Sequence, residues 1–171
     1  TLDSSIFNNA KSDGSDIRVL DSNGQAVPIE LVNYDSNNET GGLFFKASAL
    51  SDSSDNQFSI VYGNSAATAL SDSSPLGQHN VWSSGFSGVW HLDENNGGSV
   101  SGSTANGNDG QVKGAATQGV NGIMNNGFKI TGGNAEIPKD SSLTVNADNP
   151  YTLQTWYKGT DSSSALVSLM D

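Results

Sequence analysis

The sequence has 171 residues, with 18 Asp and Glu against 7 Lys and Arg, and therefore a formal net charge of −11. A surface this negative repels nucleic-acid phosphates and anionic lipid, so we expect neither as a partner. Cysteine is absent, which excludes disulfides, zinc–thiolate sites, iron–sulfur clusters and thiol catalysis. Hydrophobic residues make up 34% of the chain, enough for a core, whereas the abundant Ser, Asn, Gly and Asp favour turns over long helices.

Short apolar runs alternate with turn-rich stretches in the first part of the chain. An Asn23-Gly24 pair between two such runs predicts a hairpin, because Gly readily takes the positive φ of a tight turn. Strands at this spacing are typical of an antiparallel sandwich. We expect these strands at residues 17–20, 27–32, 42–47 and 58–63.

The alternating pattern is lost between residues 64 and 80, where small and polar residues accompany Pro75 and Gly77. We therefore predict a first module at residues 1–66, a linker at 67–80 and a second module at 81–171. Both modules are expected to be antiparallel β-sandwiches, so the predicted fold class is all-β. In the second module a hairpin turn is expected at 131–134, and the expected strands are 88–92, 110–113, 127–130, 135–138, 151–158 and 165–169.

The first module resembles a bacterial domain of unknown function, number 2341, over roughly residues 1–64. The family pattern has a K-S-D-G-x-D-I start, a P-x-E strand, a Y-D step and a closing Y-Y-G-N. Val61 stands where the first Tyr of that ending often lies. The resemblance implies no activity, because the family has none assigned. The matching segments are Lys11-Ser12-Asp13-Gly14-Ser15-Asp16-Ile17, Pro28-Ile29-Glu30, Tyr34-Asp35 and Tyr62-Gly63-Asn64.

The second module resembles the first half of a concanavalin A-like, laminin-G-type jelly roll. The matching segments are 88–94, Asn108-Asp109-Gly110, 127–138 and 151–157. An incomplete sandwich leaves open strand edges. The resemblance therefore implies that the remaining half of the jelly roll, in a longer parent protein or in a partner chain, covers them. The sequence begins at Thr1 without Met and ends within a strand-like run, so we expect a piece of a longer protein.

The two modules commonly follow one another in exported proteins, which leaves three functions open. The first is a non-catalytic extracellular or periplasmic module for binding or adhesion, with carbohydrate as the expected ligand. The second is the ectodomain of a MotA/TolQ/ExbB-type proton-channel subunit, which contacts envelope proteins and is tethered by a membrane segment outside this sequence. The third is a glycoside-active enzyme whose catalytic carboxylates lie in the missing half.

An enzyme is the least favoured of these functions. Jelly-roll glucanases carry their carboxylates on one strand in an E-x-D-x-E pattern, and the nearest match is His91-Leu92-Asp93-Glu94. His occupies the first acidic position, and neighbours such as Asp93 and Glu94 point to opposite faces of a strand. The chain also lacks a G-x-S-x-G elbow. We therefore expect no catalytic residues.

A ligand surface is predicted from alternation along two strands. On 151–158 the polar face carries Gln154 and Trp156, and on 89–94 the outer face carries His91 and Asp93. If both strands lie in one sheet, these four residues form a concave surface suited to a sugar, which needs an aromatic platform and hydrogen-bonding groups. The alternative is that loops cover Trp156. Trp82 and Phe86 are expected to join the modules.

Calcium is the only cofactor that the composition favours. An EF-hand at 35–46 is excluded, because its Gly falls at the seventh position and Lys46 stands at the twelfth. Looser candidates are Asp13 and Asp16 in the first module, and Asn108 and Asp109 in the second. The alternative at each place is a turn held by local side-chain hydrogen bonds.

Overall fold

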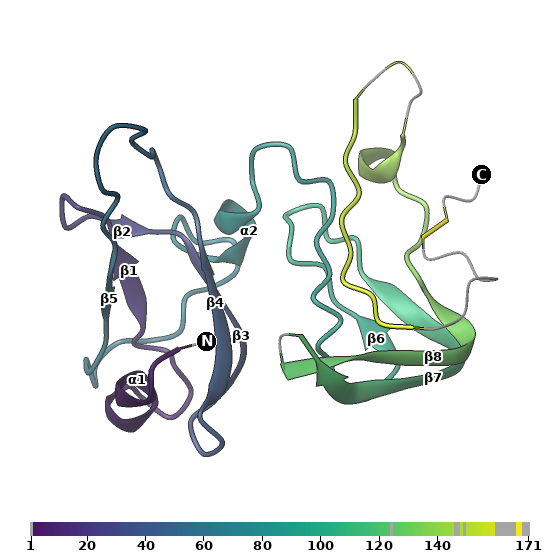
Figure 1. Ribbon diagram of the computed structural model, residues 1–171, viewed down its shortest axis with the longest axis horizontal. Coiled ribbons are helices and arrows are strands. Elements are labelled where there is room, and N and C mark those ends of the chain that lie inside the picture. Colours follow the sequence, from purple (N-terminus) through teal and green to yellow (C-terminus); the bar gives the residue numbers. More distant parts are fainter. Residues whose placement is uncertain (1, 124, 146–147, 149, 160–166, 169–171) are drawn as a thin grey trace.

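The computed structural model describes residues 2–123, 125–145, 148, 150–159 and 167–168. It is an all-β protein with antiparallel sheets, which confirms the predicted fold class. Strands β1 to β5 form the first module, and strands β6 to β8 belong to the second (Figure 1). The short helix α2, Gln78–Val81, lies between them.

The first module contains two small antiparallel sheets. One has the strand order β2-β1-β5, and the other pairs β3 with β4. All four expected strand regions of this module contain strands, although Pro28, which has no N–H to donate, separates the second region into β2 and β3. The bounds are β1 Arg18–Leu20, β2 Ala26–Val27, β3 Ile29–Asp35, β4 Thr40–Phe45 and β5 Ser59–Val61.

The expected hairpin joins β1 to β2, but its turn is longer than a two-residue primed turn. Leu20 pairs with Ala26, and within this turn only Gly24 takes a positive φ, of 75°. The side chain of Asp21 accepts from the backbone N–H groups of Asn23 and Gln25, both at 2.9 Å. Because the Asp21 side chain provides an acceptor for these backbone N–H groups, a five-residue connection is stable here.

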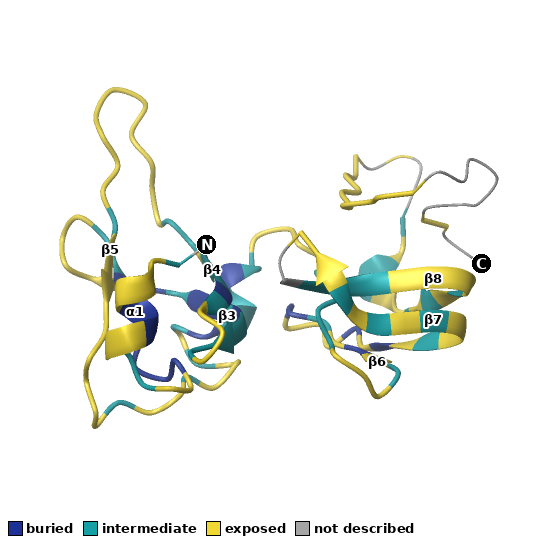
Figure 2. Cartoon of the chain, turned by 60° about the horizontal axis from the view of Figure 1, so that its bottom comes forward, coloured by how far each residue is buried: buried dark blue, intermediate teal, exposed yellow. Residues whose placement is uncertain are grey.

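The core of the first module lies between the two sheets. Val19, Val27 and Ile29 are buried together, with Leu43, Phe58 and Leu70 packed against them. Helix α1, Ser4–Asn9, is capped by Asp3, whose side chain accepts from the N–H of Ser5. Figure 2 shows the buried positions concentrated in this module.

The second module is built on one three-stranded sheet of order β6-β7-β8. Its strands are β6 Ser99–Val100, β7 Gly110–Gly122 and β8 Asn125–Glu136, followed by the 3₁₀ helix η1, Ser141–Leu143. The hairpin turn expected at 131–134 is wrong, because these residues lie inside β8. There Gly133 pairs with Gly114 and Asn134 with Lys113. The long partner strand β7, with a register shift after Ala115, keeps 127–130 and 135–136 in a single strand, which ends at Glu136.

Two expected strands do not form, at 88–92 and at 151–158. In the first, Leu92 takes a φ of 55°, which turns the chain and interrupts the alternation. In the second, the described residues 150–159 contain no strand, and the large side chains of both predicted faces are exposed. Alternating apolar and polar residues form a strand only where a neighbouring strand pairs with them and a core covers their apolar face. The strand expected at 165–169 lies mostly outside the described residues.

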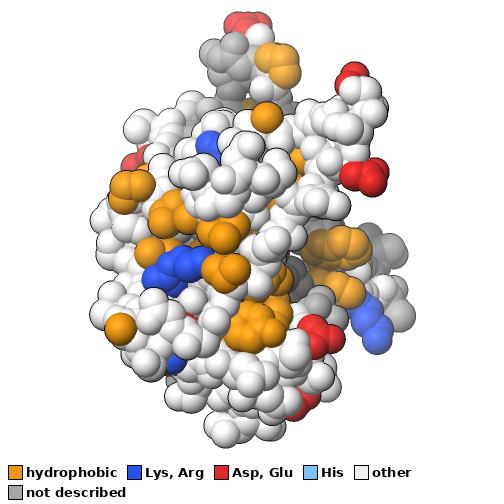
Figure 3. Space-filling model, turned by 90° about the vertical axis from the view of Figure 1, so that its left-hand side faces the viewer, with side chains coloured by type: hydrophobic (Ala, Val, Ile, Leu, Met, Phe, Trp, Pro, Cys, Tyr) orange, Lys and Arg blue, Asp and Glu red, His pale blue; other side chains and the backbone are white. Residues whose placement is uncertain are grey.

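The surface carries apolar side chains in both modules. Figure 3 shows hydrophobic side chains on the side of the first module turned away from the second, where sheet β2-β1-β5 lies. Ile60 and Val61 of the edge strand β5 are exposed there. In the part of the chain that the structure describes, no helix has the length and apolar character needed to cross a membrane.

Candidate binding site at the junction of the modules

A buried glutamate joins the two modules. Glu30 lies on β3 and is only 5% exposed. Its Oε2 accepts a hydrogen bond from Trp82 Nε1, and His91 Nε2 lies 3.0 Å from the same oxygen. A carboxylate withdrawn from water needs such polar partners, because desolvation otherwise disfavours its charge. Both partners come from residues beyond the predicted linker, so Glu30 connects distant parts of the chain.

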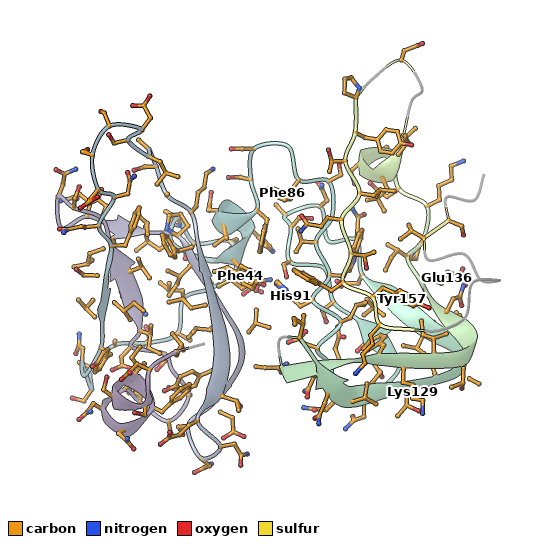
Figure 4. All side chains as sticks on the ribbon, viewed as in Figure 1. Phe44, Phe86, His91, Lys129, Glu136 and Tyr157 are labelled. Carbon is orange, nitrogen blue, oxygen red and sulfur yellow. The ribbon has the colours of Figure 1, made fainter. Side chains whose placement is uncertain are left out.

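Aromatic rings pack around this glutamate. Phe44 of β4 pairs with Glu30 in the sheet register. Its ring stacks on His91 with centroids 5.0 Å apart, and it packs against Trp82 at 5.2 Å. Figure 4 shows Phe44 and His91 facing one another between the modules. The expectation that Trp82 joins the modules agrees with these contacts.

A polar hollow of about 280 Å³ opens beside these residues, and we call it the junction hollow. Asn33 Nδ2 donates to the backbone oxygen of Asp93 at 3.3 Å across it. Asn33 and Leu92 both take a left-handed backbone, with φ of 50° and 55°. Such conformations cost free energy and gather at functional sites. The lining includes Glu30, Asn33, His91, Asp93, Glu94 and Ser101.

The electrostatics of the junction hollow are acidic. Burial raises the pKa of Asp93, the charges of Glu94 and Glu30 raise it further, and the Asp93 backbone N–H and His91 lower it. Glu94 Oε1 accepts from the N–H of Ser101. The second oxygen of Glu94 is buried and receives no hydrogen bond from the described residues. The hollow therefore offers acceptors to a ligand that brings donors.

We predict that Asp93→Asn stabilises the protein at neutral pH. Because the folded pKa of Asp93 lies above its ordinary value, the carboxyl group's contribution to stability is fully present below the ordinary pKa. That contribution is lost as the pH rises through the raised folded value. Asparagine stays neutral, so the free energy of unfolding of the variant should increase relative to that of the wild type as the pH rises. Urea denaturation at about pH 3 and pH 7 measures this difference, with exposed Asp52→Asn as the control. A variant less stable than the wild type at pH 7 would contradict the prediction.

One protein-family model matches this chain. The family model of a domain of unknown function, DUF2341, matches residues 13–100, just over half of the chain. The chain belongs to the DUF2341 family. No curated protein and no solved structure matches it. The match confirms the resemblance seen in the first module, and it also spans the junction hollow from Glu30 to Glu94.

The opening motif of the DUF2341 segment has a structural explanation. Asp16 is 3% exposed, and its two oxygens accept from the backbone N–H groups of Lys11 at 2.8 Å and Gly63 at 2.6 Å. This aspartate ties the K-S-D-G-x-D loop to the closing Y-G-N segment. Gly14 takes a φ of 67°, and a side chain there would press on Leu31 and Tyr34. The family pattern thus reflects one interlocked corner of the module.

The predicted linker lies inside the DUF2341 match and contacts the first module. Lys11 Nζ donates to the oxygen of Ala67 at 2.9 Å, and Arg18 donates to that of Thr68 at 2.9 Å. The N–H of Ile29 donates to the oxygen of Leu76 at 2.9 Å. Residues 67–80 therefore pack on the first module over much of their length.

The predicted calcium ligands are engaged in hydrogen bonds within the chain. Both oxygens of Asp16 accept from backbone N–H groups, and Asp13 accepts from Ser15. These bonds to Ser15 lower the pKa of Asp13. Asp109 accepts from Gly102, and buried Asn108 donates to the Ser87 oxygen and to Ser142 Oγ. Across the described ranges of the DUF2341 protein, no three Asp, Glu or His side chains gather closely enough to hold a metal.

Calcium binding stays a prediction, and a thermal melt tests it. An ion bound only by the folded state raises the melting temperature by mass action. If Asp13 and Asp16, or Asn108 and Asp109, hold calcium, then EDTA should lower the midpoint and added Ca²⁺ should restore it. An unchanged midpoint in EDTA would contradict a structural calcium ion.

The four predicted ligand residues separate into two pairs. His91 and Asp93 line the junction hollow. Gln154 and Trp156 do not line it, and Trp156 is 75% exposed on the segment 150–159. They were expected together only if two strands shared a sheet, and neither strand forms. Sequence reasoning missed Glu30, Asn33 and Ser101 as lining residues, although Glu30 belongs to the P-x-E family motif.

Proposed function

We propose that this DUF2341 protein is a non-catalytic, exported binding module that holds carbohydrate in the junction hollow. The observation that carries the proposal is the convergence of polar groups in that hollow. Sugar hydroxyls need directional acceptors and donors. Asp93 and Glu94 supply acceptors, and His91, whose ring stacks on Phe44, lines the same hollow. The volume of about 280 Å³ lies just below the ~300–1,000 Å³ range of small-molecule sites, which suits a ligand as small as one sugar ring.

Absence of catalysis is part of the proposal. Glu30 is occupied by Trp82 and His91, so Asp93 and Glu94 are the carboxylates left for a substrate. Their chain adjacency differs from the arrangement of glycosidases, in which two carboxylates flank the scissile bond.

A glycoside-active enzyme is the second candidate, because one observation favours it. The expectation that Asp93 and Glu94 point to opposite faces of a strand does not hold, since no strand forms there and both line the junction hollow. Asp93 also has a raised pKa, as a general acid needs.

Calorimetric titration with neutral oligosaccharides, together with an assay for released reducing ends, tests both candidates. We expect saturable binding without product. Asp93→Ala should weaken binding about tenfold, which corresponds to ~1.4 kcal/mol, while exposed Asp52→Ala should bind as the wild type does. Absence of binding would refute the proposed function. Product formation that Glu94→Gln abolishes would favour the enzyme instead.

We further propose that the second module is an incomplete jelly roll, covered in its biological context by further β-structure or by an envelope protein. Its support is the exposure of large apolar side chains on segment 150–159, among them Tyr151, Leu153 and Trp156. This surface also suits the alternative role as a MotA/TolQ/ExbB-type ectodomain. Hydrogen exchange at 150–157 should be fast in this chain and slow in a longer parent protein. Equally fast exchange in both would refute the covering.

A further inference from the structure

A lysine at the junction has no acidic partner among the residues that the structure describes. Lys46 follows β4, and its backbone N–H donates to the oxygen of Pro28 at 3.0 Å. Its ammonium group donates to Ser83 Oγ at 2.6 Å and to Ser84 Oγ at 3.0 Å. The side chain is half-buried. Two strands and the segment after α2 therefore hold this charge in a defined place.

The charge balance at Lys46 is unusual for so acidic a chain. Among the described residues, Lys46 has no carboxylate at ion-pair distance, and the basic and acidic side chains that do lie so close are His91 and Glu30. An ammonium group carries three donors, and two of them go to the serine hydroxyls. Partly buried cations are ordinarily paired. Within the described part of the chain, the ammonium group therefore has no counter-ion, and one of its donors has no partner.

The neighbouring turn adds a second donor. Ser83 gives its hydroxyl proton to the oxygen of Asn80 at 3.0 Å, whereas no acceptor for the Ser84 hydroxyl is found among the described residues. Ser84 and Gly85 take φ of 70° and 95° in succession, and a side chain at Gly85 would meet open space. The turn thus leaves open space at Gly85, the residue next to Ser84.

An exposed aromatic ring, Phe86, follows Ser84 by two residues in the chain. Phe86 is 50% exposed, and it meets the ring of Trp82 edge to face at 5.2 Å. Figure 4 shows Phe86 at the junction of the modules. A ring fixed on one side and open on the other is a platform on which the C–H face of a sugar can lie.

We propose that Lys46, Ser84 and Phe86 form a site for the carboxylate of an acidic sugar. The ammonium group and the Ser84 hydroxyl bind the carboxylate oxygens by charge-assisted hydrogen bonds, and Phe86 supports the ring. The site is separate from the junction hollow, which is lined by carboxylates that repel an anion and does not include these three residues. It therefore does not depend on the function proposed for that hollow.

Titration with trigalacturonate, with its neutral methyl ester and with sodium sulfate at constant ionic strength tests this site. We expect saturable binding of trigalacturonate that depends on Lys46 and weaker binding of sulfate. The ester should show only the binding that the junction hollow gives to a neutral sugar, and Lys46→Met should leave that binding unchanged. Lys46→Met should weaken trigalacturonate binding at least tenfold, and Lys129→Met, at an exposed lysine of β8, should leave it unchanged.

Ser84→Gly provides a variant that keeps the backbone, because glycine accepts the positive φ at this position. It should retain the melting temperature and bind trigalacturonate several-fold more weakly. Equal binding of acid and ester, sulfate binding as tight as trigalacturonate binding, or an equal loss in Lys46→Met and Lys129→Met would each overturn the proposal.

Discussion

Replacing Glu30 with alanine should lower the free energy of unfolding by about 3 kcal/mol, because hydrogen bonds to a charged group contribute ~1.5–3 kcal/mol each. The change leaves the N–H of half-buried Trp82 without its acceptor and removes the partner of His91. It also opens a space beside Phe44. Urea denaturation followed by tryptophan fluorescence measures the loss, since Trp82 reports directly on the junction.

Glu136→Ala is the matched control for this experiment. Glu136 is an exposed glutamate at the end of β8, and exposed substitutions usually change stability by less than ~0.5 kcal/mol. If Glu30→Ala were as stable as this control, the junction would not depend on the buried carboxylate and our description of it would be wrong.

Asp16→Ala should destabilise the first module to a similar extent, by about 3 kcal/mol. The carboxylate satisfies the N–H groups of Lys11 and Gly63, and its removal leaves both without their acceptor at a position that is almost fully buried. The opening loop and the segment after β5 would then separate more readily. Hydrogen exchange at these two amides, together with the urea midpoint, measures the effect.

Asp16→Asn distinguishes the effect of the two hydrogen bonds from the effect of having any polar side chain at this position. Its amide oxygen can accept from only one side, so it should recover part of the lost stability and protect at most one of the two amides. Asp52→Ala, at an exposed loop position, should leave both amides protected. Full protection in Asp16→Ala would show that the carboxylate does not hold this corner.

The strands of the first module could be predicted because each apolar run there meets a partner strand, and most of these runs also meet the core. Val19 and Ile29 lie in two such runs and are both buried. The segment 151–158 has the same alternation, yet its large side chains remain exposed. The local sequence pattern shows which side chains a strand could bury. Whether a neighbouring strand is present to pair with it depends on the tertiary fold, which the pattern does not contain. The turn predicted at 131–134 is wrong for the converse reason. These residues have a turn-forming composition, but they pair with β7 and lie within β8.

The candidate site was half accessible from the sequence. His91 and Asp93 can be singled out by their residue types. Their predicted position on one face, however, depends on a strand that the left-handed backbone of Leu92 prevents. Glu30 lies between Ile29 and Leu31 in a buried strand, where a charged residue indicates a buried partner without naming it. That partner lies about sixty positions along the chain, and only the fold brings the two together.

Amide chemical-shift mapping tests whether the junction hollow holds a sugar without cleaving it. On titration of the ¹⁵N-labelled protein with neutral oligosaccharides, the shifts should gather at residues 30–33, 91–94 and 101–103, and the sugar's own spectrum should remain that of the intact compound. Shifts confined to 150–157, no shifts at all, or the appearance of shorter sugars would contradict the account.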